Sequence, residues 1–293
     1  MPLHLLPLRS LAGLLAAAAL ATGCTYTVDE TYTFQSAAAP VGDLTVTTFN
    51  GSIVLTRDNA ATRVHGTITV RASGYDSRAQ AVEATRRVTL FESGDAAHLD
   101  LTVLPPSGTS RDRFGADLDL FVPPDVRVTA LTNDGAILVD GLRTARLETD
   151  RGQIELRFTR GATEIRTADA PVIVDSHDGA LNVATRNAPI DLFSVVGDLQ
   201  ARTTNGFITC RALPPYGAEL VLSTTNAGVD LTLPFDFGAE LVATTTAGNI
   251  YVEGLDFYAT YDAPGQLEGE LYDGAGLVDV RTTAADIAIH ARR

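Results

Sequence analysis

A six-residue pattern that returns along the chain constrains its fold more than any other feature. The pattern is Thr or Ser, any residue, usually Asn or Asp, then Gly or Ala, any residue, and Ile, Leu or Val. Copies begin at Thr48, Thr132, Thr149, Thr167, Ser176, Thr185, Thr203, Thr224, Thr245 and Thr282. Such self-similarity indicates a repeat architecture, in which each unit buries its apolar face against the next.

The flanks of each copy predict what one unit looks like. Apolar and polar residues alternate before the turn, as in Leu199/Ala201, and after it, as in Ile190/Leu192. A period of two is typical of strands with one buried face. Asn, Asp and Gly suit a tight turn because they tolerate positive φ. Each unit is therefore predicted to be a strand, a turn and a second strand.

The spacing of the copies favours stacked coils over hairpins. Thr149, Thr167, Thr185 and Thr203 are 18 residues apart, and the later step to Thr224 is 21 residues. A coil must return to the same place beside its neighbour, whereas separate hairpins have less reason to hold one period. We predict an all-β fold, an elongated right-handed β-solenoid with one short helical excursion. The alternative is an antiparallel β meander or sandwich.

The predicted organisation has three parts. Residues 1–23 are predicted to be a signal peptide of the lipoprotein type, and 24–43 an N-terminal tether and first strand. Residues 44–293 are predicted to form a single β-solenoid domain, irregular over 44–127 and regular over 128–293. The helical excursion is expected from Ser77 to Arg87, because Ala79, Val82 and Thr85 fall roughly on one side of a helix.

The N-terminal segment predicts export and membrane attachment. Arg9 precedes the apolar run from Leu11 to Leu20, which is too short to span a bilayer. The stretch Leu20-Ala21-Thr22-Gly23-Cys24 resembles the lipobox of bacterial lipoproteins, which implies a lipid on Cys24. Thr25, and not an aspartate, follows the cysteine, and the resemblance to lipoproteins implies the outer membrane where a cell has two membranes. A plain secretory signal is the alternative. Exchange of Cys24 for Ala is expected to release the protein from the membrane fraction, and fatty-acid labelling would expose an error.

Charge narrows the range of partners. The net charge is −14, and the sequence contains no lysine. A nucleic-acid binder needs clustered cations, so no nucleic-acid partner is expected. The acidity would also repel an anionic lipid surface, so attachment must depend on the lipid. A cell-wall or surface glycan, or an envelope protein, is the predicted class of partner, and no cofactor is expected.

One stretch carries a resemblance to a known family. The segment Leu120-Phe121-Val122-Pro123-Pro124-Asp125-Val126 is followed by the repeat Thr132–Ile137 and by Val139-Asp140-Gly141-Leu142. This arrangement resembles the "putative adhesin" group of uncharacterised bacterial β-solenoid (pseudo-β-helix) proteins, here exported as a lipoprotein. The resemblance covers most of the chain from about residue 44. Its motifs are structural, so it implies a fold and an adhesin-like role, with no catalytic residues to carry over.

Familiar catalytic signatures are absent, and we predict that the chain is not an enzyme. His65, His98, His177 and His290 are expected to be surface or turn residues and not metal ligands. Cys210 occupies the slot that Leu192 and Leu231 fill in other copies, so we predict a buried, unreactive thiol.

The Asp/Asn position of the repeat suggests an aligned edge. Stacked coils should bring some of these side chains into one column. Cation binding along that column is one hypothesis, and turn formation is the favoured one. The residues at this position include Asp134, Asp169, Asp178, Asn187, Asn205 and Asn226.

The stretch from Tyr251 to Tyr272 is the candidate ligand surface, because its aromatic residues mingle with carboxylates. These aromatic residues are Tyr251, Phe257, Tyr258, Tyr261 and Tyr272. They could form a sugar platform, or a cap that shields the last coils, which is the favoured interpretation. The leading hypothesis is thus a non-catalytic, lipid-anchored envelope module for binding or structure. The alternative is a polysaccharide-binding or polysaccharide-cleaving β-helix.

Overall fold

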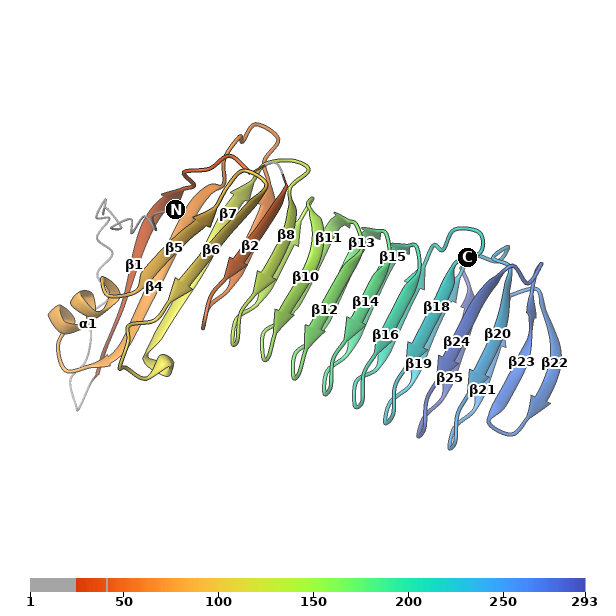
Figure 1. The fold of residues 1–293 in the computed structure, drawn as a ribbon. Coiled ribbons are helices and arrows are strands. Elements are labelled where there is room, and N and C mark those ends of the chain that lie inside the picture. The colour runs from red at the N-terminus through yellow and green to blue at the C-terminus, as the bar shows by residue number, and fades with distance from the viewer. Residues whose placement is uncertain (1–24, 41, 293) are drawn as a thin grey trace. The chain divides into compact units, whose positions relative to one another are not determined.

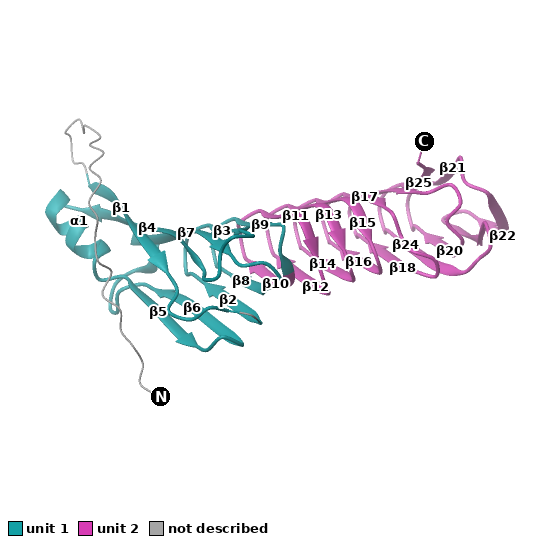
Figure 2. Cartoon of the chain, turned by 90° about the horizontal axis from the view of Figure 1, so that it is seen from above, with its two compact units in different colours: residues 1–143 teal, residues 144–293 magenta. Residues whose placement is uncertain are grey.

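The computed structural model describes residues 25–40 and 42–292, and it confirms the all-β class (Figure 1). The predicted signal peptide and the lipidated Cys24 lie outside the described residues. The chain divides into two compact units, residues 1–143 and 144–293 (Figure 2). No described helix is long and apolar enough to cross a bilayer.

The second unit consists of two rows of strands. Row A contains β10 (Arg143–Thr149), β12 (Thr163–Thr167), β14 (Leu181–Ala184), β16 (Leu199–Arg202), β18 (Glu219–Ser223), β24 (Gly276–Arg281) and β20 (Ala239–Thr244). Row B contains β11 (Ile154–Arg160), β13 (Val172–Asp178), β15 (Ile190–Val196), β17 (Ile208–Ala212), β19 (Val229–Leu233), β25 (Ile287–Ala291) and β21 (Ile250–Glu253). Neighbours within each row are parallel, as coils require and hairpins do not.

The register carries the 18-residue period of the sequence into space. Ile165 of β12 pairs with Val183 of β14, which pairs with Ala201 of β16. All three side chains are fully buried. Burying a Val, Leu or Ile side chain contributes about 1.5–3 kcal/mol, so this inward column stabilises the stack at every coil.

The last coil of the sequence is not the last coil in space. Strand β24 pairs with β18 on one side and with β20 on the other, and β25 lies likewise between β19 and β21. The C-terminal segment is therefore inserted one coil inside the end of the stack. Beyond it, β23 (Gln266–Leu271) pairs antiparallel with β20 and with β22 (Phe257–Ala263), so this hairpin covers the end of row A.

The first unit begins with antiparallel strands. Its elements are β1 (Tyr26–Gln35), β2 (Asp43–Thr47), β3 (Ile53–Arg57), β4 (His65–Tyr75), α1 (Arg78–Thr85), β5 (Thr89–Gly94), β6 (His98–Leu104), a 3-10 turn (Arg111–Arg113), β7 (Phe114–Val122), β8 (Arg127–Leu131) and β9 (Ile137–Asp140). Helix α1 coincides with the predicted excursion, and the Ser77 side chain caps it by accepting a hydrogen bond from the Gln80 amide.

The first unit also contains an inserted coil. Strand β2 lies between β6 and β8, and β3 lies between β7 and β9, all in parallel. Antiparallel strands stand outside them, with β4 on β7 and β5 on β6. Leu44, Val46, Ile53 and Leu55 of the inserted coil are completely buried. Strands β2 and β3 come early in the sequence, yet they lie inside the stack and contribute to its core.

The turns explain why the repeat begins with threonine. The Thr203 hydroxyl donates to the carbonyl oxygen of Ala188 at 3.2 Å, and the Thr224 hydroxyl donates to that of Gly206 at 3.0 Å. Each threonine therefore satisfies a backbone acceptor of the preceding coil.

The predicted Asp/Asn column forms in part. Asn226 Nδ2 lies 2.6 Å from Asn205 Oδ1, Asn205 Nδ2 lies 2.6 Å from Asn187 Oδ1, and Asn187 Nδ2 lies 2.5 Å from Asp169 Oδ1. Side-chain oxygens of this ladder thus accept hydrogen bonds from neighbouring amides, which supports the turn-forming interpretation. The prediction that Asp178 belongs to this column is wrong, because Asp178 ends β13 and lies at the other corner of the coil.

The prediction that His177 is a surface or turn residue is also wrong. Ser176 has φ of +65°, which breaks the alternation of β13 and turns the next side chain inward. His177 is only 1% exposed. Its Nδ1 lies 3.0 Å from Thr159 Oγ1, and its Nε2 lies 3.0 Å from the Gly161 carbonyl oxygen. A neutral ring can satisfy both contacts by donating from Nε2 and accepting at Nδ1.

Burial gives His177 a pH-dependent effect on stability. Desolvation lowers the pKa of His177, despite hydrogen bonds to the backbone at Gly161 and Ala180 and the nearby Asp178 that raise it. The unfolded chain binds the proton with the ordinary pKa of 6.5, so it binds more protons than the folded chain as pH falls through that value. The free energy of unfolding should therefore be highest above this pH and decline below it.

Exchange of His177 for Gln should flatten this decline. The measurement is urea unfolding between about pH 7.5 and pH 5. The control is His290→Gln, since His290 is partly exposed and its nearest carboxylate belongs to the exposed Glu253. Equal slopes for the wild type and His177→Gln would contradict the burial of a neutral imidazole.

Candidate functional site

The outer face of row A carries polar side chains at one register position on three successive strands. Register aligns Glu164 of β12 with Asn182 of β14, then Gln200 of β16 and Val221 of β18. These positions alternate with the buried ones, so their side chains face away from the core. Neighbouring strands are about 4.8 Å apart, so Glu164, Asn182 and Gln200 present hydrogen-bonding groups at this interval on three successive strands.

A groove of 420 Å³ runs along this face. Small side chains of Ala145, Ala162 and Ala180 line it together with the repeated polar groups. Asp198 and Glu219 stand at its border, where the Asp198 carboxylate accepts a hydrogen bond from the Glu219 backbone amide at 3.0 Å. The alanines leave room, and the longer side chains of the aligned set supply hydrogen-bonding groups.

The polar groups of the groove are available to a ligand. In the described part of the chain, neither the Asn182 side-chain amide nor the Gln200 side-chain amide has a hydrogen-bond partner. The Glu164 carboxylate forms an ion pair with Arg166 on the same strand. Two free amides beside a charged pair can donate to and accept from hydroxyl groups, which is the recognition chemistry of neutral sugars.

The structure distributes the predicted aromatic residues over several elements. Tyr251 lies on β21 in row B, and Tyr272 lies in the turn after β23, with exposures of 45% and 61%. Phe257 is half-buried opposite Leu271. Tyr258 and Tyr261 lie on β22 and are 72% and 48% exposed. The five residues thus do not form one platform.

Tyr258 and Tyr261 nevertheless share a face. They pair with Glu270 and Glu268 of β23, and the register shifts between Ala259 and Tyr261. This bulge restores Tyr261 to the face of Tyr258, which strict alternation over three residues would not do. Because β23 pairs with β20, the two tyrosines lie on an extension of the outer face of row A.

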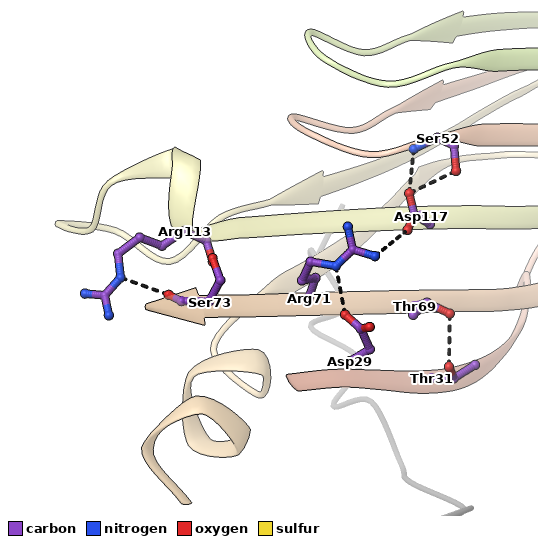
Figure 3. Close-up of polar contacts among 8 residues, drawn as sticks. All are labelled: Asp29, Thr31, Ser52, Thr69, Arg71, Ser73, Arg113 and Asp117. Carbon is purple, nitrogen blue, oxygen red and sulfur yellow. Dashed lines mark hydrogen bonds and ion pairs between the residues drawn. The ribbon is translucent and has the colours of Figure 1, made fainter. Parts of the chain in front are cut away.

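A second hollow lies in the first unit, where polar side chains bind one another. Its volume is 490 Å³. Arg71 Nε lies 2.9 Å from Asp29 Oδ1, and its Nη2 lies 3.9 Å from Asp117 Oδ2 (Figure 3). Asp117 Oδ1 in turn accepts from the Ser52 amide at 2.7 Å and from its hydroxyl at 2.9 Å.

The arginine at the border of this hollow is also bound by its neighbours. The Arg113 guanidinium carbon lies 4.1 Å from the centre of the Tyr75 ring, and its Nε donates to the Ser73 carbonyl. These groups already have partners, so the hollow is a structural network that joins β1, β4 and β7.

Cys210 is placed as the repeat predicts. Its side chain is fully buried between Leu192 and Leu231 of the neighbouring strands. Desolvation raises the pKa of the thiol to about 12, with a smaller contribution from Asp230. A thiol that stays protonated is a weak nucleophile and metal ligand. Within the described residues, no cluster of three or more His, Cys, Asp or Glu could hold a metal ion.

Reasoning from sequence missed the groove, although a signal for it exists. Glu164, Asn182 and Gln200 recur at 18-residue steps between the apolar positions of their strands. The polar positions of the alternating strands, compared at 18-residue steps, predict this column. The small residues at the border, Ala162 and Ala180, follow the same interval.

Comparison with known proteins gives little further guidance. No protein-family model and no curated protein matches the chain. A crystal structure of a "putative cell adhesion protein" from Clostridium sporogenes is 10% identical, covering 91% of this chain and 100% of its own, with a TM-score of 0.29. A "putative adhesin" from Bacteroides fragilis is 10% identical over 92% and 98%, with a TM-score of 0.28. Scores this low carry no conclusion about function.

Proposed function

We propose that this chain is a non-catalytic, adhesin-like binding module of the bacterial cell envelope, held to a membrane by a lipid on Cys24. Its ligand is a neutral glycan chain that lies in the row A groove. The observation that carries the proposal is the alignment of Glu164, Asn182 and Gln200 across three successive strands. Hydrogen-bonding side chains at equal intervals suit a polymer whose sugar units also repeat at equal intervals.

The repetition also favours binding over catalysis. Glycoside hydrolysis needs two carboxyl groups with different roles, placed on either side of one bond. The groove instead presents hydrogen-bonding side chains at equal intervals on three strands, and Glu164 is the single carboxylate of that column. An outer face that continues to Tyr258 and Tyr261 adds aromatic surface on which sugar rings can stack.

A glycan-array screen with the whole chain tests the proposal, followed by titration of the best neutral oligosaccharide. The double variant Asn182→Ala/Gln200→Ala should bind at least about tenfold more weakly, because two hydrogen bonds contribute about 1 kcal/mol each. The matched control is Thr204→Ala, an exposed turn residue outside the groove. It should bind like the wild type.

Two results would overturn the proposal. One is unchanged affinity in the double variant. The other is release of sugar fragments that stops when a single Asp or Glu is exchanged, which would establish a polysaccharide-cleaving enzyme instead. Weaker binding of Tyr258→Ala/Tyr261→Ala would extend the ligand surface onto the hairpin β22–β23.

A further inference from the structure

A separate cleft of 580 Å³ opens on row B of the second unit. Register aligns four of its residues across adjacent strands: Phe193 with Arg211, then Thr232, then His290. Ser194 and Arg292 also line it. The cleft shares no residue with the row A groove, so a ligand in it is independent of the proposed function.

The cations of this cleft differ from four other arginines of the unit. Each of those four forms an ion pair with a carboxylate two residues away on its own strand. These pairs are Arg146–Glu148, Arg157–Glu155, Arg166–Glu164 and Arg281–Asp279. Two residues before Arg211 stands Thr209, and two residues before Arg292 stands His290, so neither position holds a carboxylate.

Neither of the two guanidinium groups has an ion pair or a hydrogen bond with any described residue. The carboxylate nearest to His290 belongs to Glu253, 3.7 Å from Nδ1, and its side chain is 71% exposed on β21. Three more carboxylates lie on this face. Asp175 aligns with Phe193, and Asp191 and Asp230 both align with Thr209, two residues before Arg211. None of the three forms an ion pair with Arg211 or Arg292. In a chain of net charge −14, the cleft therefore holds unpaired positive charge.

The remaining groups of the cleft indicate the kind of anion. The Arg211 guanidinium carbon lies 5.5 Å from the centre of the Phe193 ring, so an apolar ring borders the cation. The hydroxyls of Ser194 and Thr232 stand beside it and have no hydrogen-bond partner among the described residues. A guanidinium recognises a carboxylate with two parallel hydrogen bonds, hydroxyls recognise hydroxyls, and a ring contacts the apolar face of a sugar.

We propose that this cleft binds the carboxylate of an acidic sugar residue, a uronate, through Arg211 and Arg292. Ser194 and Thr232 contact the sugar hydroxyls, and Phe193 contacts its carbon face. A small inorganic anion would use only the arginines, and an acidic peptide would not need the two hydroxyls.

Calorimetric titration of the whole chain with a trigalacturonate tests this inference, with its methyl ester as the neutral counterpart. The acid should bind at least about tenfold more tightly than the ester, and Arg211→Ala and Arg292→Ala should each lose about tenfold, since a charge-assisted hydrogen bond contributes more than 1.4 kcal/mol. The matched control is Arg186→Ala, an exposed turn arginine that removes the same charge. It should bind normally.

Binding of the acid should also persist in Asn182→Ala/Gln200→Ala, which separates this cleft from the groove. Equal affinity for acid and ester, or an unchanged Arg211→Ala variant, would overturn the inference. So would inorganic phosphate or an aspartate-rich peptide that displaces trigalacturonate at a lower concentration than the free acid itself.

Discussion

A chain that ends at Ala275 is expected to lose the cooperative fold of the repeat unit, and not merely to become one coil shorter. The deleted strands β24 and β25 each pair with neighbours on both sides. Their inward side chains Val278, Val280, Ile287 and Ile289 are completely buried. Burial of four such side chains contributes about 6–12 kcal/mol. That range is comparable with the whole stability of a typical domain, about 5–15 kcal/mol.

The ordinary expectation for a repeat protein is different. Where coils stack in sequence order, loss of the last repeat removes one interface and leaves the others intact. Here the deletion opens a gap between β18 and β20, with unpaired backbone groups on both sides. Urea unfolding followed by circular dichroism should therefore show no cooperative transition for the second unit. A chain ending at Ala291 is the control, because it keeps both strands. A truncated chain with an unchanged midpoint would contradict the inserted position.

Insertion at both ends of the chain has a common physical consequence. In the first unit β2 and β3 also lie one coil inside, and β4 and β5 pair antiparallel outside them. In the second unit, β23 pairs antiparallel with β20 at the end of row A. An antiparallel strand does not offer the parallel register of the next coil. These antiparallel strands therefore act as caps. They prevent another coil or another chain from adding to the exposed edge of the stack.

The fold of the regular coils could be predicted from local sequence. The 18-residue period of the repeat equals the sequence separation of the residues that pair in neighbouring coils. Eighteen residues separate Leu147 from Ile165 and Ile165 from Val183, and the structure pairs them in that order. Inward and outward positions follow from alternation alone. Cys210 is an example, because its slot in the repeat correctly predicted complete burial.

The inserted coils could not be predicted this way. Leu220 pairs with Val278, 58 residues along the chain, although the repeat offers Leu241 at a step of 21. Nothing local distinguishes these two partners, since both are aliphatic residues in alternating strands. Global packing and the hairpin β22–β23 decide between them. The same limit applies to the cleft, because His290 comes beside Thr232 only through the insertion.

The second limit is backbone conformation. Phe158, Ser176 and Ser194 have positive φ, at +50°, +65° and +55°. Such values are uncommon outside glycine, so simple alternation continues through these positions and wrongly predicts His177 to lie outside. The residues that follow each of them are buried or face inward at the corner of the coil. The 18-residue spacing of these three positions was the available signal.

The exchange of Gly206 for Ala is expected to destabilise the second unit by about 3 kcal/mol or more, although the repeat itself suggests tolerance. Ala170 and Ala188 occupy the same template position in the two preceding coils. At Gly206, however, an added Cβ would lie 1.8 Å from the carbonyl oxygen of Ala188. That atom is backbone, so it cannot move aside as a flexible side chain does.

To admit the new Cβ, the backbone at Ala188 or at residue 206 would have to move, and this movement would also disturb contacts that hold neighbouring coils together. The same Ala188 oxygen accepts the Thr203 hydroxyl, and the Gly206 carbonyl accepts the Thr224 hydroxyl. The control is Gly217→Ala, where φ is +76° but the nearest atom, Ala275 O, is 4.0 Å away. It should cost only the strain of a left-handed backbone, about 1 kcal/mol. Urea unfolding of both variants measures the difference. Equal losses of stability would mean that the coils can separate enough to admit a methyl group, and that the close approach at Gly206 does not limit the stack.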